Sequence, residues 1–182
     1  MTRLFVALKI PEDIIEIIIK IRNSAVPNPQ KYKWEDKNKI HLTLKFIGEV
    51  NDELILPITD RILFIEEYKK FYCKLTKFSF FCRNGKPGIL WLGLNLNPEI
   101  FNLVERLNKE LETFSIPSEN KKFKPHLTIK RLKGNEDKEF VDEFEKVIVP
   151  EINFTAGEIS LIKSDLLSAG SQYKELKIYN LK

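Results

Sequence analysis

The chain has 182 residues, with 30 Lys and Arg against 26 Asp and Glu, so its formal net charge is +4. This length suits one well-buried domain or two small lobes that share an interface. No apolar run approaches the roughly 20 residues that a membrane helix needs, and residues 1–9 lack the features of a signal peptide. We therefore expect a cytoplasmic protein without a membrane partner. The mild positive charge is compatible with an anionic ligand but does not by itself indicate one.

The first part of the chain alternates strand-like and helix-like runs. Residues 4–10 predict a strand, and Pro11-Glu12-Asp13 is typical of a helix start, because proline suits the first turn and acidic groups favour the positive end of the helix dipole. The Ile-rich stretch that follows to Arg22 predicts a helix, since its charged residues are spaced as on one helix face. Residues 40–48 predict a strand that closes on a glycine.

The middle of the chain predicts a helix followed by a β-hairpin. Residues 52–68 favour one helix, in which Pro57 marks an irregular first turn. Residues 71–82 and 89–95 predict two strands, because the turn-forming stretch 83–88 lies between them.

The second half repeats this alternation. Asn97-Pro98-Glu99 predicts the start of a helix whose apolar residues fall on one stripe. The remaining expected elements are a polar loop over 115–124, a strand over 125–132, a short helix over 137–146, and two strands over 151–166 and 173–181.

The two cysteines, Cys73 and Cys82, are nine residues apart in one strand-like run. A regular strand directs residues at an odd spacing to opposite faces, so a disulfide between them is not expected. No C-x-x-C pattern indicates metal binding. We interpret both as reduced packing residues.

The only two histidines lie in matching surroundings. His41 begins His-Leu-Thr-Leu-Lys, and His126 begins His-Leu-Thr-Ile-Lys 85 residues later. Because side chains alternate along a strand, each histidine shares a face with the threonine two residues on, while the aliphatic residues point to the other face. If two similar halves face each other, both His/Thr pairs line one cleft.

Two opposed imidazoles suit displacement at phosphorus. With an ordinary pKa of about 6.5, one ring can act as a neutral base while the other acts as a protonated acid. Threonine hydroxyls can donate hydrogen bonds to phosphate oxygens, and nearby cations can stabilise the developing charge. This scheme requires no metal and no cofactor.

Other classes of site fit less well. A zinc site needs three or four ligands, and the chain offers no third histidine or suitably spaced cysteine. A G-x-S-x-G elbow, a P-loop and a dinucleotide-binding fingerprint are also missing.

At these residues the chain resembles the two-histidine (2H) phosphoesterase superfamily, and more closely the bacterial and archaeal RNA 2′,3′-cyclic phosphodiesterases, historically called 2′-5′ RNA ligases. The family pattern H-x-T-x occurs twice, at His41–Leu44 and at His126–Ile129. The likeness spans essentially the whole chain. Further matching segments are residues 3–7, Trp34, residues 45–50, Pro125, Lys130-Arg131, Ser164 and Tyr173.

The resemblance implies an α+β fold in which residues 1–182 form a single bilobal domain. Two antiparallel sheets with flanking helices would be related by a pseudo-twofold axis, with the cleft between them. It further implies hydrolysis of RNA 2′,3′-cyclic phosphate ends to 2′-phosphomonoesters. His41 would be the proton donor and His126 the proton acceptor, while Thr43, Thr128 and Arg131 would bind the phosphate. The expected partner is RNA with such an end, or a small cyclic nucleotide, and the protein is expected to be a monomer.

Strand alternation alone does not decide which cation reaches the phosphate. Arg131 has the opposite parity to His126, so either the strand bulges or ends after Ile129, or Lys130 acts instead. The family pattern favours Arg131. Aromatic residues that could stack on bases are Tyr32, Trp34, Phe46, Phe123 and Tyr173, although most aromatics are expected in the core. The loop Lys121-Lys122-Phe123-Lys124 is the best basic segment for an RNA backbone, with a solvated lysine run as the alternative.

Two further functions stay open at this stage. The same site could run in reverse and ligate RNA ends through a 2′-5′ bond. Alternatively, the cleft could bind nucleotide or RNA without turnover, although the presence of both histidines and both threonines disfavours this interpretation.

Overall fold

The computed structural model describes residues 1–119, 121–132, 138–168 and 170–182. Its strands are β1 (Thr2–Lys9), β2 (His41–Val50), β3 (Phe71–Arg83), β4 (Lys86–Leu96), β5 (His126–Arg131), β6 (Asn153–Ala156), β7 (Glu158–Leu167) and β8 (Gly170–Asn180). Its α-helices are α1 (Glu12–Ser24), α2 (Ile55–Arg61), α3 (Glu99–Glu112) and α4 (Lys138–Lys146). Short 3₁₀ turns lie at 29–31, 37–39, 52–54 and 63–67.

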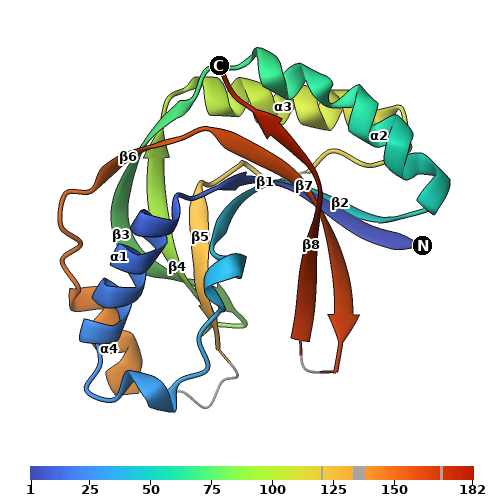
Figure 1. The fold of residues 1–182 in the computed structure, drawn as a ribbon. Coiled ribbons are helices and arrows are strands. Elements are labelled where there is room, and N and C mark those ends of the chain that lie inside the picture. Colours follow the sequence, from blue (N-terminus) through green and yellow to red (C-terminus); the bar gives the residue numbers. More distant parts are fainter. Residues whose placement is uncertain (120, 133–137, 169) are drawn as a thin grey trace.

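The strands form one curled antiparallel sheet in the order β6-β3-β4-β5-β2-β1-β7-β8 (Figure 1). It consists of two four-stranded halves, which meet where Leu42 of β2 pairs with Leu127 of β5. In each half, the strand that carries a histidine pairs with the strand that precedes it across a helix, β1-α1-β2 and β4-α3-β5. The connectivity is therefore the same for the two strands next to this Leu42–Leu127 seam on either side, whereas the outer strands of the two halves are connected differently.

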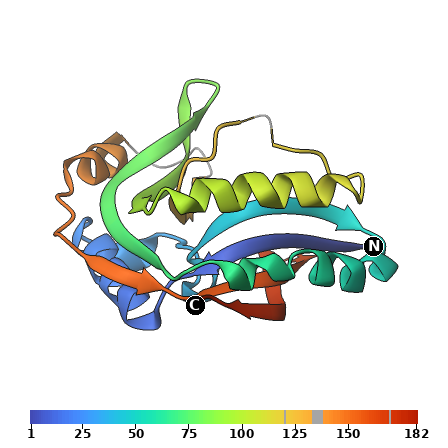
Figure 2. The same cartoon turned by 90° about the horizontal axis from the view of Figure 1, so that it is seen from above.

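The helices cover the two halves in pairs (Figures 1 and 2). Helices α1 and α4 lie beside the half made of β3, β4, β5 and β6, whereas α2 and α3 lie over the half that contains β2. On the α4 side, Phe144 packs edge-on against Phe78 of β3 at 5.2 Å. On the other side, α3 buries its apolar stripe completely or nearly so: Ile100, Leu103, Val104, Leu107 and Leu111.

The helix-covered face of the sheet holds the main core. Leu42, Leu44, Leu127 and Ile129 belong to it, so the aliphatic positions of both motifs are buried. On the opposite face, Phe5, Ala7 and Ile162 form a small separate cluster with Tyr173 packed against it.

The α+β class and the two lobes expected from the sequence are confirmed, and the seam joins the two expected sheets into one. The hairpin between β3 and β4 also forms, but its turn is tighter than expected. Asn84 and Gly85 adopt φ of 52° and 73°, as a two-residue hairpin turn requires, so the strands continue through most of the stretch expected to be a loop.

Three expectations are wrong. Residues 52–68 do not form one helix, because only Ile55–Arg61 is α-helical and 3₁₀ turns lie on both sides. The strand expected over 151–166 is two strands. Strand β6 pairs with β3 in one half and β7 pairs with β1 in the other, so the chain crosses between lobes at Gly157. Cys73 is buried as expected, but Cys82 is exposed and is not a packing residue.

Burial at the seam predicts that truncating Leu127 destabilises the fold far more than truncating the exposed Leu56. Leu127→Ala is expected to lower the free energy of unfolding by about 2–5 kcal/mol, because Leu127 is fully buried where the two halves meet. Leu56→Ala makes the same change at a residue that is 73% exposed, and is expected to cost about 0.5 kcal/mol or less. Urea unfolding of both variants measures the difference, and equal losses would contradict this account of the seam.

Candidate active site

Both motifs lie at the start of central strands, on the face of the sheet away from the helices. Within β2 and β5, histidine and threonine are half-buried, while the leucine between them is fully buried. The alternation predicted from the sequence is therefore present in both motifs.

The seam brings the two motifs together in a crossed arrangement. Leu42 pairs with Leu127 in antiparallel register, so the residues that flank each leucine face each other across the seam. This register directs His41 toward Thr128, and Thr43 toward His126. Each histidine therefore shares its side of the site with the threonine of the other motif.

A bulge follows the threonine in each motif. In β5, Trp91 pairs with Thr128 and Leu90 with Lys130, so Ile129 is an extra residue. In β2, the partners of Thr43 and Lys45 are consecutive residues of β1, so Leu44 is extra in the same way. A bulge shifts the alternation by one residue.

The bulge decides the positions of the two cations. Ile129 and Lys130 are both buried, and Arg131 returns to the face that carries Thr128. The Arg131 side chain is 63% exposed and lines the cleft, where its Nε lies 3.2 Å from Oε1 of Glu35. The buried Lys130 instead donates to the carbonyl oxygen of Lys33 at 3.3 Å. The exposed cation at this end of β5 is therefore Arg131, whereas Lys130 is buried.

Aromatic rings pack against each imidazole. His41 stacks on Phe5, with ring centroids 5.1 Å apart, and meets the edge of Tyr173 at 5.7 Å. His126 meets Phe81 edge-on at 4.8 Å and Trp91 at 6.2 Å. These contacts fix the plane of each ring and remove water from around it.

The hydrogen-bond partner of His126 decides which ring nitrogen carries the proton. Nδ1 lies 2.7 Å from the carbonyl oxygen of Lys124, which can only accept a hydrogen bond. Nδ1 must therefore carry the proton, and in the neutral ring the lone pair lies on Nε2. This is the tautomer that a general base requires when it acts through Nε2.

Burial lowers the pKa of both histidines. For His41, desolvation, with a contribution from the Arg131 charge, lowers the pKa from 6.5 to about 4. Desolvation also lowers the pKa of His126, the bond to the Lys124 carbonyl raises it, and the Lys124 and Arg131 charges lower it. Both rings are therefore neutral at pH 7 in the free protein.

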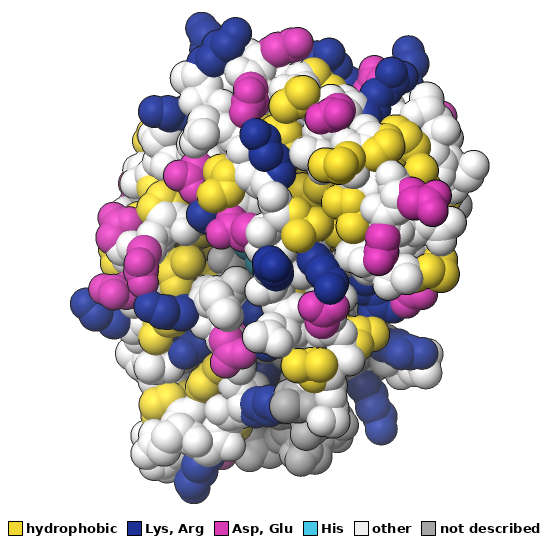
Figure 3. Space-filling view, turned by 45° about the vertical axis from the view of Figure 1, so that its right-hand side comes forward, with side chains coloured by type: hydrophobic (Ala, Val, Ile, Leu, Met, Phe, Trp, Pro, Cys, Tyr) yellow, Lys and Arg dark blue, Asp and Glu magenta, His cyan; other side chains and the backbone are white. Residues whose placement is uncertain are grey.

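The motifs open into a large cleft between the lobes, with a volume of about 1530 Å³. Among the described residues, nine Lys and Arg line it against three acidic residues. The basic set is Arg3, Lys31, Lys33, Lys39, Lys121, Lys122, Lys124, Lys130 and Arg131. On the face shown in Figure 3, acidic and basic side chains are interspersed. The cleft thus concentrates positive charge that the small net charge does not reveal.

Residues outside the motifs complete the site. Glu35, Phe5 and Phe81 line the cleft, and sequence reasoning did not single them out. Of these three residues, only Glu35 could have been suspected from the sequence. It lies six residues before His41, and a second glutamate, Glu119, lies seven residues before His126. All five aromatics considered for base stacking line the cleft: Tyr32, Trp34, Phe46, Phe123 and Tyr173.

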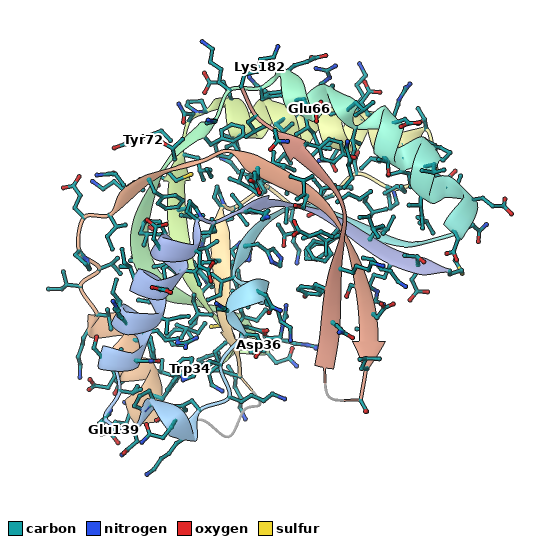
Figure 4. The ribbon with its side chains drawn as sticks, in the orientation of Figure 1. Trp34, Asp36, Glu66, Tyr72, Glu139 and Lys182 are labelled. Atoms are coloured by element: carbon teal, nitrogen blue, oxygen red, sulfur yellow. The ribbon has the colours of Figure 1, made fainter. Side chains whose placement is uncertain are left out.

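These aromatics differ in how much of each ring is available. Trp34 packs on Phe140 and Phe144 of α4, on the side shown in Figure 4, so it is largely a packing residue. Phe46 is 62% exposed. The basic loop at 121–124 also lines the cleft, and Lys124 Nζ lies 4.2 Å from the centre of the Trp91 ring.

The described part of the chain has neither a cluster of metal ligands nor a membrane-spanning helix. Within the described ranges, no three His, Cys, Asp or Glu side chains gather as a metal site would require. No helix in the same ranges is long and apolar enough to cross a membrane.

Comparison with known proteins decides the family. The model of the family described as LigT like Phosphoesterase matches residues 8–91 and 94–173. The chain belongs to the LigT-like phosphoesterases, within the 2H superfamily. Both histidine motifs fall inside the matched ranges.

Relatives of this LigT-like phosphoesterase carry consistent names. A protein named RNA 2′,3′-cyclic phosphodiesterase from Methanocaldococcus jannaschii is 30% identical over 96% of this chain and 98% of its own length. Another of that name, from Thermotoga maritima, is 28% identical over 96% of this chain and 92% of its own. A crystal structure of Escherichia coli LigT complexed with 3′-AMP superimposes with a TM-score of 0.78 at 25% identity, covering 100% of this chain and 98% of that one.

The pKa of His41 gives a direct test of this site. In the free protein we expect His41 to titrate near pH 4, and inorganic phosphate in the cleft to raise that pKa, because an anion stabilises the imidazolium and offsets Arg131. NMR titration of the two histidines, with and without phosphate, measures both values. A His41 pKa near 6.5 in the free protein, or no rise with phosphate, would contradict the electrostatics described.

Proposed function

We propose that this protein hydrolyses RNA 2′,3′-cyclic phosphate ends to 2′-phosphomonoesters by two-histidine acid–base catalysis. The observation that carries the proposal is the meeting of both His/Thr pairs with Arg131 in one basic cleft. The names of the family relatives support the cyclic phosphodiester as substrate.

His126 acts as the base in this proposal. Its Nδ1 proton is held by the Lys124 carbonyl, so the Nε2 lone pair can take a proton from water. The water oxygen then forms a bond to phosphorus as the bond from phosphorus to the 3′ oxygen breaks. The product carries the phosphate on the 2′ oxygen.

His41 acts as the acid and protonates the departing 3′ oxygen. In the free protein its pKa of about 4 disfavours the protonated form at neutral pH. The negative charge of the bound phosphodiester stabilises the imidazolium, so substrate binding itself raises the pKa and prepares the acid. After each turnover, His126 releases its proton to solvent and His41 regains one.

Thr43, Thr128 and Arg131 bind the phosphate. The threonine hydroxyls donate to the non-bridging oxygens from the same face as the histidines. The guanidinium of Arg131 stabilises the charge that builds up on those oxygens as water attacks. Arg131→Met is therefore expected to lower kcat/KM by roughly a hundredfold.

The size and charge of the cleft support a polynucleotide rather than a small cyclic nucleotide as substrate. About 1530 Å³ exceeds the roughly 300–1,000 Å³ of a typical small-molecule pocket. The lysines at 121, 122 and 124 lie along one wall of the cleft, where phosphates of the preceding nucleotides can follow them.

The activity is tested with an oligonucleotide that ends in a 2′,3′-cyclic phosphate, incubated in the presence of a chelator. The wild-type protein is expected to yield the 2′-phosphomonoester, and His41→Ala and His126→Ala are each expected to lose at least about a thousandfold in kcat. Lys74→Met, on the outer surface of β3, serves as the control and is expected to retain activity. Full activity in either histidine variant would refute the assignment, and a 3′-phosphate product would refute the direction of cleavage.

The pH profile tests whether substrate binding raises the pKa of the proton donor. Because kcat/KM reports the free protein and kcat reports the complex, the fall of kcat at high pH should lie at least about one pH unit above the corresponding fall of kcat/KM. The reason is that the pKa of His41 is raised in the complex, where the phosphate is bound, and stays low in the free protein. Coincident basic limbs in the two profiles would exclude His41 as a donor prepared by its substrate.

A further inference from the structure

The lysine that ends each motif is buried, although lysine is rarely found in a protein interior. Lys45 is 1% exposed and Lys130 is 4% exposed. They occupy equivalent positions, because each follows the bulge after the threonine. The mechanism proposed above uses neither amine, so both burials need an explanation.

Each lysine binds the loop that leads into the histidine of the other motif. Lys45, on the strand of His41, donates to the carbonyl oxygen of Pro117 at 2.6 Å. Pro117 lies in the loop that leads into His126. Lys130, on the strand of His126, donates to the carbonyl oxygen of Lys33 at 3.3 Å, in the loop that leads into His41.

A glutamate strengthens each of these contacts. Two residues after Pro117, the Oε1 atom of Glu119 accepts a hydrogen bond from the backbone N–H of Phe46 at 3.3 Å. Two residues after Lys33, the backbone N–H of Glu35 donates to the carbonyl oxygen of Ile129 at 3.0 Å. Each loop is thus fastened to the opposite histidine strand at two points.

Each of these two loops contains a residue that contacts a proposed catalytic side chain. The loop held by Lys45 contains Lys124, whose carbonyl oxygen fixes the Nδ1 proton of His126. The loop held by Lys130 contains Glu35, whose carboxylate pairs with Arg131 at 3.2 Å. Neither lysine lies on the loop that it holds, so each acts at a distance on a group of the proposed chemistry: Lys45 on His126 of the other motif, and Lys130 on Arg131 of its own strand.

From this geometry we infer that Lys45 and Lys130 are positioning residues that act through the loops they bind: Lys45 sets the tautomer of His126, and Lys130 sets the position of Arg131 through Glu35. The inference rests on the proposed function for its kinetic consequences, but the contacts themselves are independent of it. A lysine suits this task because its amine can donate to a loop carbonyl while its apolar stem packs in the core.

The test uses Lys45→Met and Lys130→Met, which keep the length of the side chain and remove the donor. Lys74→Met is the matched control, because Lys74 pairs with Glu151 on the surface. Long-range proton–nitrogen NMR of the free proteins reports the tautomer of each histidine. Kinetics on the cyclic phosphate oligonucleotide report kcat and KM.

The two variants are expected to differ in kind. Lys45→Met should shift the ring nitrogen signals of His126 toward a mixture of tautomers, leave those of His41 in place, and lower kcat roughly tenfold with KM within about twofold. Lys130→Met should leave the His126 signals in place and raise KM several-fold, because Arg131 loses its placed partner. The Lys74→Met control should match the wild type in kcat, in KM, and in the ring nitrogen signals of both His41 and His126.

Several results would overturn the inference. One is that both variants match Lys74→Met in kcat, KM and ring signals. Another is that each variant shifts both histidines alike, which would make the lysines general supports of the fold. If Lys45→Met does not fold, Glu119→Ala removes the second contact of the same loop at an exposed residue, and must shift His126 alone. If the wild type turns over no cyclic phosphate, the proposed function fails, while the NMR signals still decide the positioning roles.

Discussion

The pairing of Leu42 with Leu127 is the constraint on which the site depends. Both leucines are fully buried, so water exclusion holds the two lobes together at this one point of the ladder. Because the strands are antiparallel, the same pair directs each histidine toward the threonine of the other motif. Any slip by one residue would send the histidines into the core and the leucines into the cleft, so core packing fixes the chemistry.

The bulge after each threonine directs neighbouring residues to opposite faces of the sheet and so gives them different roles. It sends the motif lysine inward, where Lys45 and Lys130 each bind the loop that leads into the other motif, and it turns the next residue outward. That next residue is Phe46 in one half and Arg131 in the other. A nearly symmetric scaffold therefore carries an exposed ring on one side and a cation on the other, and this difference gives the two histidines unequal surroundings.

Desolvation and the basic cleft act together on the histidines. The aromatic rings packed on His41 and His126 favour their neutral forms, and the charge of Arg131 has the same effect. An anionic ligand in the cleft reverses the electrostatic part of this preference. The free site thus holds two neutral imidazoles, and in the proposed mechanism the acid forms only with the substrate in place.

The sequence by itself determined the pairing of histidine with threonine, the burial of the residues between them, and most of the helices and strands. These features follow from local periodicity, which an isolated segment already carries. It did not determine that the chain changes lobes at Gly157, that residues 52–68 form a short α-helix between two 3₁₀ turns, or that Glu35 pairs with Arg131. It left Arg131 and Lys130 undecided as well, because a bulge exists only relative to a partner strand. Only the tertiary structure supplies that partner, so the identity of the outward cation was decided by β4 and not by the motif.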